Sequence, residues 1–197
     1  YFDEVDHKGH VTGHDSEDTY HAIRQTDAAI SQLIEGLKAR NQFESTNMLV
    51  VSDHGMANTD QDKAIVLDDL VPVDAFEFVS RGAFAQINAR AGKEDILDAV
   101  LSQPIPHMNC WRGNQTPERF RFGSHARVTR WVCMGDEGWT LYDRAVLTRF
   151  GVNPGSHGFD PELESMAAIF IATGPDIRQG ARLGTFENTA VYPLLAR

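Results

Sequence analysis

Residues 47–52 form a short apolar run, Asn-Met-Leu-Val-Val-Ser, in which hydrophobic and polar side chains do not alternate. Such a run is typical of a strand buried on both faces, as in a parallel sheet. Before it, residues 15–41 place Ile and Leu at the spacing of one apolar helix face, with Asp15 or Ser16 suited to cap the first turn. A comparable apolar run follows at residues 167–172. Helices that alternate with such runs predict an α/β fold.

The pattern changes between residues 71 and 143. Residues 84–88 and 127–132 predict strands, the second of them half-exposed, and residues 93–101 predict a short helix. This stretch is therefore interpreted as a smaller α+β insertion on the main sheet. The predicted division is an α/β core made of residues 1–70 and 144–197, and an insertion made of residues 71–143.

Composition limits the classes of partner. The formal net charge is −10 and the pI is near 5.2, which argues against a protein that holds duplex nucleic acid by massed Lys and Arg. A small anionic substrate is compatible with this charge, because bound metal ions can reverse the local potential. No apolar run approaches the roughly 18 to 20 residues of a membrane span, and no signal peptide is recognised.

Cys110 and Cys133 are the two cysteines of the sequence. They lack the spacing of a CxxC motif, and two are too few for a disulfide-scaffold protein. Two buried free thiols are favoured over a bridge between them, which stays open as the alternative.

Three short segments carry acidic and imidazole side chains. Asp6 and His10 stand four residues apart, so that a helical turn or a tight loop would let both reach one cation. Asp53 and His54 follow the run at 47–52 directly, where an α/β sheet gathers its ligands. His157 lies between glycines in a polar loop, which would let backbone approach a metal or a phosphate closely.

These five side chains form a mixed nitrogen and oxygen set that suits zinc better than manganese or iron. They are too many for one catalytic zinc that keeps a water, and too few for two closed sites. Because two metals can share them while positions stay open for the reactants, they fit a two-metal centre for phosphoryl transfer.

Residues 1–10, 50–56 and 155–158, in this order and at these separations, resemble the second half of the nucleotide pyrophosphatase/phosphodiesterase family of the alkaline phosphatase superfamily. The resemblance covers nearly the whole chain. It implies an alkaline-phosphatase-like, mostly parallel sheet flanked by helices. It also implies a site with two Zn²⁺ ions, in which Asp6, His10 and His157 bind one ion and Asp53 and His54 bind the other, with Tyr1 as a platform on which a nucleotide base stacks.

The function implied by the resemblance is hydrolysis of phosphodiester or pyrophosphate bonds in nucleotides by two in-line displacements. In the family a Thr or Ser nucleophile belongs to the earlier half of the chain, so no residue here matches it. The sequence is therefore interpreted as a fragment that is inactive alone, from a protein exported to a bacterial periplasm or the extracellular space. A phosphomonoesterase or sulfatase-like relative and a non-catalytic zinc-binding fragment are the alternatives.

The sequence departs from the family pattern near these motifs. Val5 stands where a Pro usually precedes the Asp, and Phe159 and Pro161 replace a usual Tyr and Asn. His14 replaces a common Pro and adds an imidazole near the site. None of these changes removes an expected ligand, and His14 is expected to be a solvated loop residue.

Overall fold

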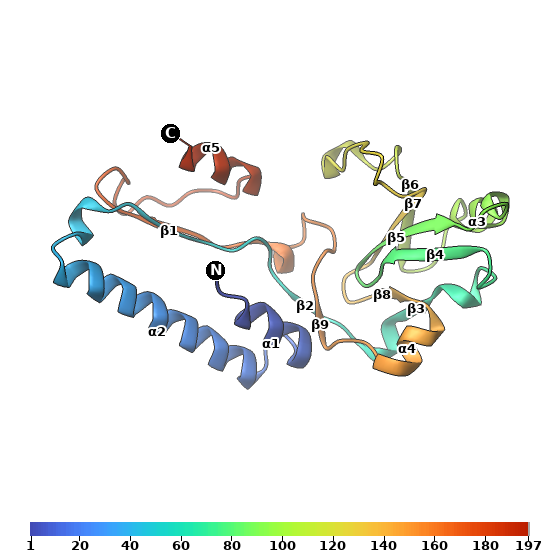
Figure 1. The fold of residues 1–197 in the computed structure, drawn as a ribbon, viewed down its shortest axis with the longest axis horizontal. Coiled ribbons are helices and arrows are strands. Elements are labelled where there is room, and N and C mark those ends of the chain that lie inside the picture. Colours follow the sequence, from blue (N-terminus) through green and yellow to red (C-terminus); the bar gives the residue numbers. More distant parts are fainter. Residues whose placement is uncertain (197) are drawn as a thin grey trace.

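The computed structural model describes residues 1–196 and has two parts joined by a narrow middle (Figure 1). One part holds both ends of the described chain and the longest helix, and the other holds a four-stranded sheet. Five α-helices occur in the described residues: α1 (Glu4–Thr12), α2 (Glu17–Ala39), α3 (Glu94–Leu101), α4 (Arg144–Phe150) and α5 (Val191–Leu195).

Ten strands form four separate sheets in the same residues. They are β1 (Met48–Val51), β2 (Ala57–Asn58), β3 (Ala64–Val66), β4 (Phe76–Ser80), β5 (Phe84–Ala89), β6 (Met108–Arg112), β7 (Trp131–Gly135), β8 (Thr140–Tyr142), β9 (Gly155–Ser156) and β10 (Phe170–Thr173). The mixed α/β composition is confirmed.

The helix expected at residues 15–41 is confirmed as α2. Its N-cap is Ser16, whose hydroxyl accepts a hydrogen bond from the backbone N–H of Thr19 at 3.1 Å. Glu17 and Asp18 follow in the first turn, where the helix dipole favours negative charge. Ile23 and Leu33 of the apolar stripe are nevertheless exposed in this chain.

The strand expected at residues 47–52 is confirmed as β1, but its pairing differs from the parallel sheet that was expected. β1 pairs with β10 in antiparallel register, with Val50 opposite Ile171. Strand β10 also begins three residues later than the apolar run that predicted it. The expected burial on both faces is also not found in these residues, because Val51 of β1 and Ile171 of β10 are exposed. The continuous apolar pattern predicted a strand but carries no information on strand direction.

The sheet on the other side of the molecule is antiparallel throughout, with the order β4-β5-β7-β6. Its inner face packs on α3 and forms the main core, which includes Ile87, Leu97 and Trp131. Beside it, β3 and β8 form the one parallel pair found in the described residues.

The expected strand at residues 84–88 and the expected helix at 93–101 are confirmed as β5 and α3. The strand expected at residues 127–132 is wrong in position: the ladder begins only at Trp131 and continues to Gly135, entirely buried. Val128 closes a turn by donating its N–H to the carbonyl of His125. The apparent alternation therefore came from a turn that precedes a fully buried strand.

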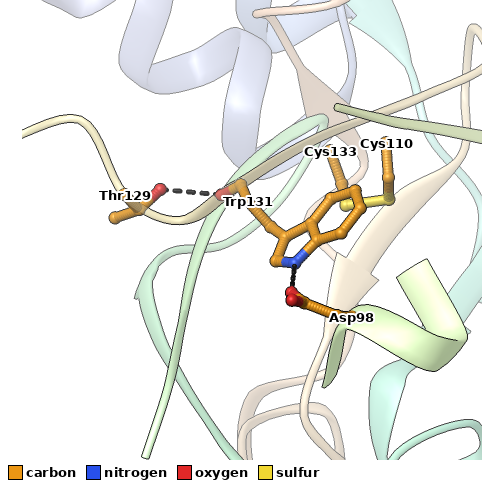
Figure 2. The surroundings of a disulfide bond; sticks show 5 residues. All are labelled: Asp98, Cys110, Thr129, Trp131 and Cys133. Carbon is orange, nitrogen blue, oxygen red and sulfur yellow. Dashed lines mark hydrogen bonds between the residues drawn. A yellow bond between two sulfur atoms is a disulfide. The ribbon is translucent and has the colours of Figure 1, made fainter. Parts of the chain in front are cut away.

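Cys110 and Cys133 form a disulfide, so the favoured assignment of two free thiols is wrong (Figure 2). The two residues lie directly opposite each other on β6 and β7, and their Cα atoms are 4.1 Å apart. Sequence separation hides this proximity, because the pairing of two antiparallel strands creates it. Trp131 lies beside the bridge and donates its indole N–H to Asp98 at 2.8 Å.

No helix in the described part of the chain is both long enough and apolar enough to cross a membrane.

Candidate metal centre

Asp6 and His10 belong to α1, one turn apart on the same helix face. The sequence left a turn or a loop open, and the structure has a helix. His10 is tied to the middle of the molecule, because its Nδ1–H donates to the carbonyl of Gly155 at 2.8 Å. Since a carbonyl only accepts, this bond places the proton on Nδ1 and leaves Nε2 with a free lone pair.

Glycines permit the close contact between α1 and β9. A Cβ on Gly155 would lie 2.1 Å from the carbonyl oxygen of Gly9, which no real contact allows. The same is true at Gly55, where a Cβ would lie 2.1 Å from the carbonyl oxygen of Ser165. Backbone approaches of this kind bring the segments that carry His10, His54 and His157 together.

Three imidazoles surround one carboxylate oxygen. Oδ1 of Asp6 lies 3.6 Å from Nε2 of His10 and 3.6 Å from Nε2 of His157. His54 follows at 4.0 Å, and its ring stacks on His157 with the centroids 3.6 Å apart. Four of the five expected ligands are therefore brought together from α1, the loop after β1 and the loop after β9.

The same oxygen, Oδ1 of Asp6, is buried and has no hydrogen-bond partner. A buried, unpartnered carboxylate oxygen is costly unless a cation satisfies it. Two ligand atoms about 2.1 Å from a tetrahedral zinc lie roughly 3.4 Å from each other. The observed separations of 3.6 Å are close to that value, and one ligand atom from each of Asp6, His10 and His157 lies within 4.8 Å of the others.

His54 has the same tautomer as His10. Its Nδ1 lies 2.9 Å from the carbonyl oxygen of Gly55 and donates to it, so Nε2 is again the nitrogen with the free lone pair. Backbone carbonyls that orient imidazoles in this way are typical of metal sites. The sequence analysis did not identify either carbonyl. Every residue has a backbone carbonyl, so residue types cannot show which one accepts a hydrogen bond, and only the neighbouring glycines hint at a close approach.

Burial lowers the pKa of His157 below its ordinary value, and the nearby His54 and His10 lower it further, while Asp6 and Asp53 act in the opposite direction. The ring is therefore neutral at neutral pH. A neutral imidazole is the form that binds a metal.

Asp53 and Tyr1 are placed differently from these four residues. The Asp53 side chain is 72% exposed, and its Oδ1 lies 3.7 Å from Nε2 of His54, on the rim of the cluster. Its backbone carbonyl accepts from the side chain of Asn188 at 3.0 Å. Tyr1 is fully exposed, and His14 is exposed, as expected for a loop residue.

The family model described as Type I phosphodiesterase / nucleotide pyrophosphatase matches residues 1–160. Among curated relatives, the Homo sapiens bis(5'-adenosyl)-triphosphatase ENPP4 is 29% identical over 196 residues, which are 99% of this chain and 42% of the relative. The Homo sapiens ectonucleotide pyrophosphatase/phosphodiesterase family member 5 is 29% identical over 199 residues, which are 99% of this chain and 40% of that protein. The chain thus spans about two fifths of the length of these relatives.

Solved structures give the same result. Murine ectonucleotide pyrophosphatase/phosphodiesterase 5 matches with a TM-score of 0.90 and 29% identity, covering 97% of this chain and 50% of the solved one. An inactive variant of that protein in complex with AMP matches with a TM-score of 0.89, 29% identity and the same coverage. The expected alkaline-phosphatase-like fold is therefore confirmed.

Proposed function

The chain belongs to the type I phosphodiesterase / nucleotide pyrophosphatase family, and from that premise we propose that it supplies most of a two-zinc site for hydrolysis of phosphodiester or pyrophosphate bonds in nucleotides. The observation that carries the proposal is the buried, unpartnered Oδ1 of Asp6 among three imidazoles whose Nε2 atoms face it. A zinc pair supplies positive charge to the attacking and leaving oxygens of an in-line displacement.

The proposed ligands in this chain are assigned to two zinc ions. Asp6, His10 and His157 hold one ion, and Asp53 with His54 contributes to the second, as the family resemblance implies. Backbone carbonyls of Gly155 and Gly55 fix the tautomers of His10 and His54, so that the ligand nitrogens stay unprotonated. The attacking hydroxyl belongs to a Thr or Ser outside this chain.

Adenine nucleotides are the first substrates to test. One relative is named a bis(5'-adenosyl)-triphosphatase, and a solved relative holds AMP. Tyr1 offers an exposed aromatic face on which a base can stack.

We also propose that the complete protein works in an oxidising compartment, the periplasm or the extracellular space. The bridge between Cys110 and Cys133 supports this, because disulfides persist mainly outside the cytosol. The relatives named ectonucleotide pyrophosphatases agree with it.

The ligand assignment is tested by the substitution His157→Ala in the complete protein. We expect at least a tenfold loss of zinc affinity, measured by elemental analysis after dialysis against graded chelator, together with loss of phosphodiesterase activity. The matched control is His21→Ala, since His21 is an exposed histidine on α2. Full zinc content and unchanged kinetics in the His157 variant would show that the assignment is wrong.

Anomalous scattering at the zinc edge tests the metal count separately. We expect one peak among Asp6, His10 and His157 and a second beside His54.

A substrate panel of nucleotide diesters, monoesters and sulfate esters then separates the diesterase from a phosphomonoesterase or a sulfatase-like relative. Bound zinc without any turnover would instead indicate a non-catalytic metal-binding protein.

A further inference from the structure

A cavity of about 150 Å³ lies on the outer face of the four-stranded sheet, and we name it the aromatic cavity. Its main walls are the side chains of Phe84, Trp111, Phe120, Phe122, Met134 and Phe159. None of the described residues that line it carries a charge, and Thr116 supplies the one side-chain hydroxyl.

The sheet side of the cavity follows from strand alternation. On β7, Trp131 and Cys133 face the core on α3, so Val132 and Met134 point to the opposite face. Phe84 of β5 lies directly opposite Met134, and Trp111 of β6 lies directly opposite Val132. Both faces of this small sheet are therefore apolar, although one apolar face suffices for packing on a helix.

A short segment covers this second face. Residues 118–120 form a 3₁₀ turn, and the Phe120 ring stands edge-on to Trp111 with the centroids 5.5 Å apart. The Phe122 ring lies 5.3 Å from that of Phe84. The rings thus surround the cavity and leave it unfilled.

An ion pair between Arg119 and Asp160 joins this short segment to the loop that follows His157. Arg119 donates two hydrogen bonds to Asp160, one of them at 2.7 Å from Nη1 to Oδ1. This fork geometry fixes both position and orientation. Gly158, Phe159 and Pro161 from the same loop complete the cavity wall, so an occupant would contact the residues next to a proposed zinc ligand.

We propose that the aromatic cavity is a binding site for a small molecule with a single neutral aromatic ring. The volume suits a ring with one or two substituents, since an engineered apolar cavity of about this size takes up benzene. Aromatic walls favour an aromatic occupant through edge-to-face contacts. An ionised ligand would lose its hydration without gaining a charged partner.

The test is a titration of the complete protein with 4-fluorotoluene, followed by ¹⁹F NMR in the presence of EDTA. We expect saturable binding with Kd of about 1 mM or below, which is typical for so few heavy atoms. 4-Fluorobenzoate, of nearly the same shape but charged, is expected to bind at least tenfold more weakly. Because metal is chelated, the result is independent of the proposed hydrolysis.

Two variants locate the site. Val132→Phe fills the cavity and is expected to weaken 4-fluorotoluene binding at least tenfold, whereas Val79→Phe, at an exposed position of β4, leaves it unchanged. Phe122→Ala enlarges the cavity and is expected to admit 1-fluoronaphthalene, which the unmodified protein excludes. If Val132→Phe does not fold, as judged by circular dichroism, the change of ring preference in the Phe122 variant decides.

The proposal is overturned by any of three results. The first is no saturable binding of 4-fluorotoluene up to its solubility limit. The second is an unchanged Kd in folded Val132→Phe. The third is an unchanged ring preference in Phe122→Ala.

Discussion

At the scale of single residues, backbone contacts position the candidate centre as much as its ligands do. Gly9 of α1 and Gly155 of β9 touch through their backbones, and His10 donates to the Gly155 carbonyl from the same contact. A methyl group at Gly155 would meet the carbonyl oxygen of Gly9 and push the strand away from the helix. The imidazole would then lose the acceptor that fixes its tautomer.

Gly155→Ala is therefore expected to lower both stability and zinc affinity. The added Cβ meets the Gly9 carbonyl at 2.1 Å, so the backbone must shift, at a cost of about 1–3 kcal/mol in the free energy of unfolding. Loss of the orienting hydrogen bond is expected to weaken zinc binding by about 10- to 100-fold. Urea unfolding and a zinc titration measure the two effects.

The matched control is Gly36→Ala in the interior of α2, where a Cβ meets nothing within 4 Å. Alanine has the higher helix propensity, so the control is expected to gain about 0.5–1 kcal/mol of stability with unchanged zinc affinity. Equal zinc affinity in both variants would contradict the positioning role of Gly155.

The five proposed ligands could be singled out from the sequence because their types and their order along the chain are specific, and four of them lie together in the structure. Their mutual arrangement could not, since a strand of two residues, β9, and two glycine contacts bring the loops together. The disulfide was missed for a related reason: Cys110 and Cys133 become neighbours only through the antiparallel register of β6 and β7. Local periodicity predicts the presence of α2 and β1 well, but it predicts poorly how far their apolar side chains are buried and which segments they pair with.

At the scale of elements, α3 is joined to the four-stranded sheet by one carboxylate. Asp98 accepts hydrogen bonds from Arg112, Arg130 and the indole of Trp131. Its side chain is only 15% exposed. These donors, Arg130 first, hold the pKa of Asp98 well below its usual range.

The lowered pKa of Asp98 gives a pH dependence with a definite sign. The unfolded carboxyl has a pKa of about 3.9, so the charged network contributes fully above that pH, and its contribution is lost as the pH falls through the lower folded pKa. At pH 7, Asp98→Asn is expected to reduce the free energy of unfolding by about 2–4 kcal/mol, since it removes the charge that partners two guanidinium groups.

Urea unfolding at pH 7 and at pH 3 measures this. The deficit of the Asn variant is expected to shrink at the lower pH, because the unmodified protein has begun to lose the contribution of its charged carboxylate. Asp95→Asn, at an exposed position of the same helix, is the control and is expected to change stability by less than about 0.5 kcal/mol. A deficit that is independent of pH would contradict the assignment.

The bridge between β6 and β7 acts on the same sheet. It closes a loop with a sequence separation of 23 residues, which corresponds to about 3 kcal/mol in the chain-entropy account. The double substitution Cys110→Ala with Cys133→Ala is expected to lower the free energy of unfolding by that amount. Reduction of the unmodified protein with a phosphine should have nearly the same effect, and no change from either treatment would show that the bridge does not form.

At the scale of the whole molecule, the two parts differ in how much of their apolar side-chain surface is buried. The sheet part has a closed core on α3, whereas the part with α2, β1 and β10 exposes large apolar side chains. Examples are Leu33 on the helix and Val51 and Ile171 on the strands. The division into a core of 1–70 and 144–197 and an insertion of 71–143 stays a prediction, as does the assignment of each zinc ligand.

This chain covers 50% of each solved relative, and the proposed catalysis assigns the nucleophile to a segment other than residues 1–197. No Thr or Ser here lies at the family's nucleophile motif. A fragment of residues 1–197 is therefore expected to bind zinc, since Asp6, His10 and His157 are all present, and to hydrolyse p-nitrophenyl thymidine phosphate no faster than zinc-loaded buffer. Without a positioned hydroxyl, the zinc ligands alone provide no covalent route.

The complete protein, assayed in parallel at equal zinc occupancy, should turn the substrate over, with its activity abolished by chelator. Robust metal-dependent turnover by the fragment would mean that a residue within 1–197, or a metal-activated water, performs the displacement, and the proposed division of labour between the two halves would have to be abandoned.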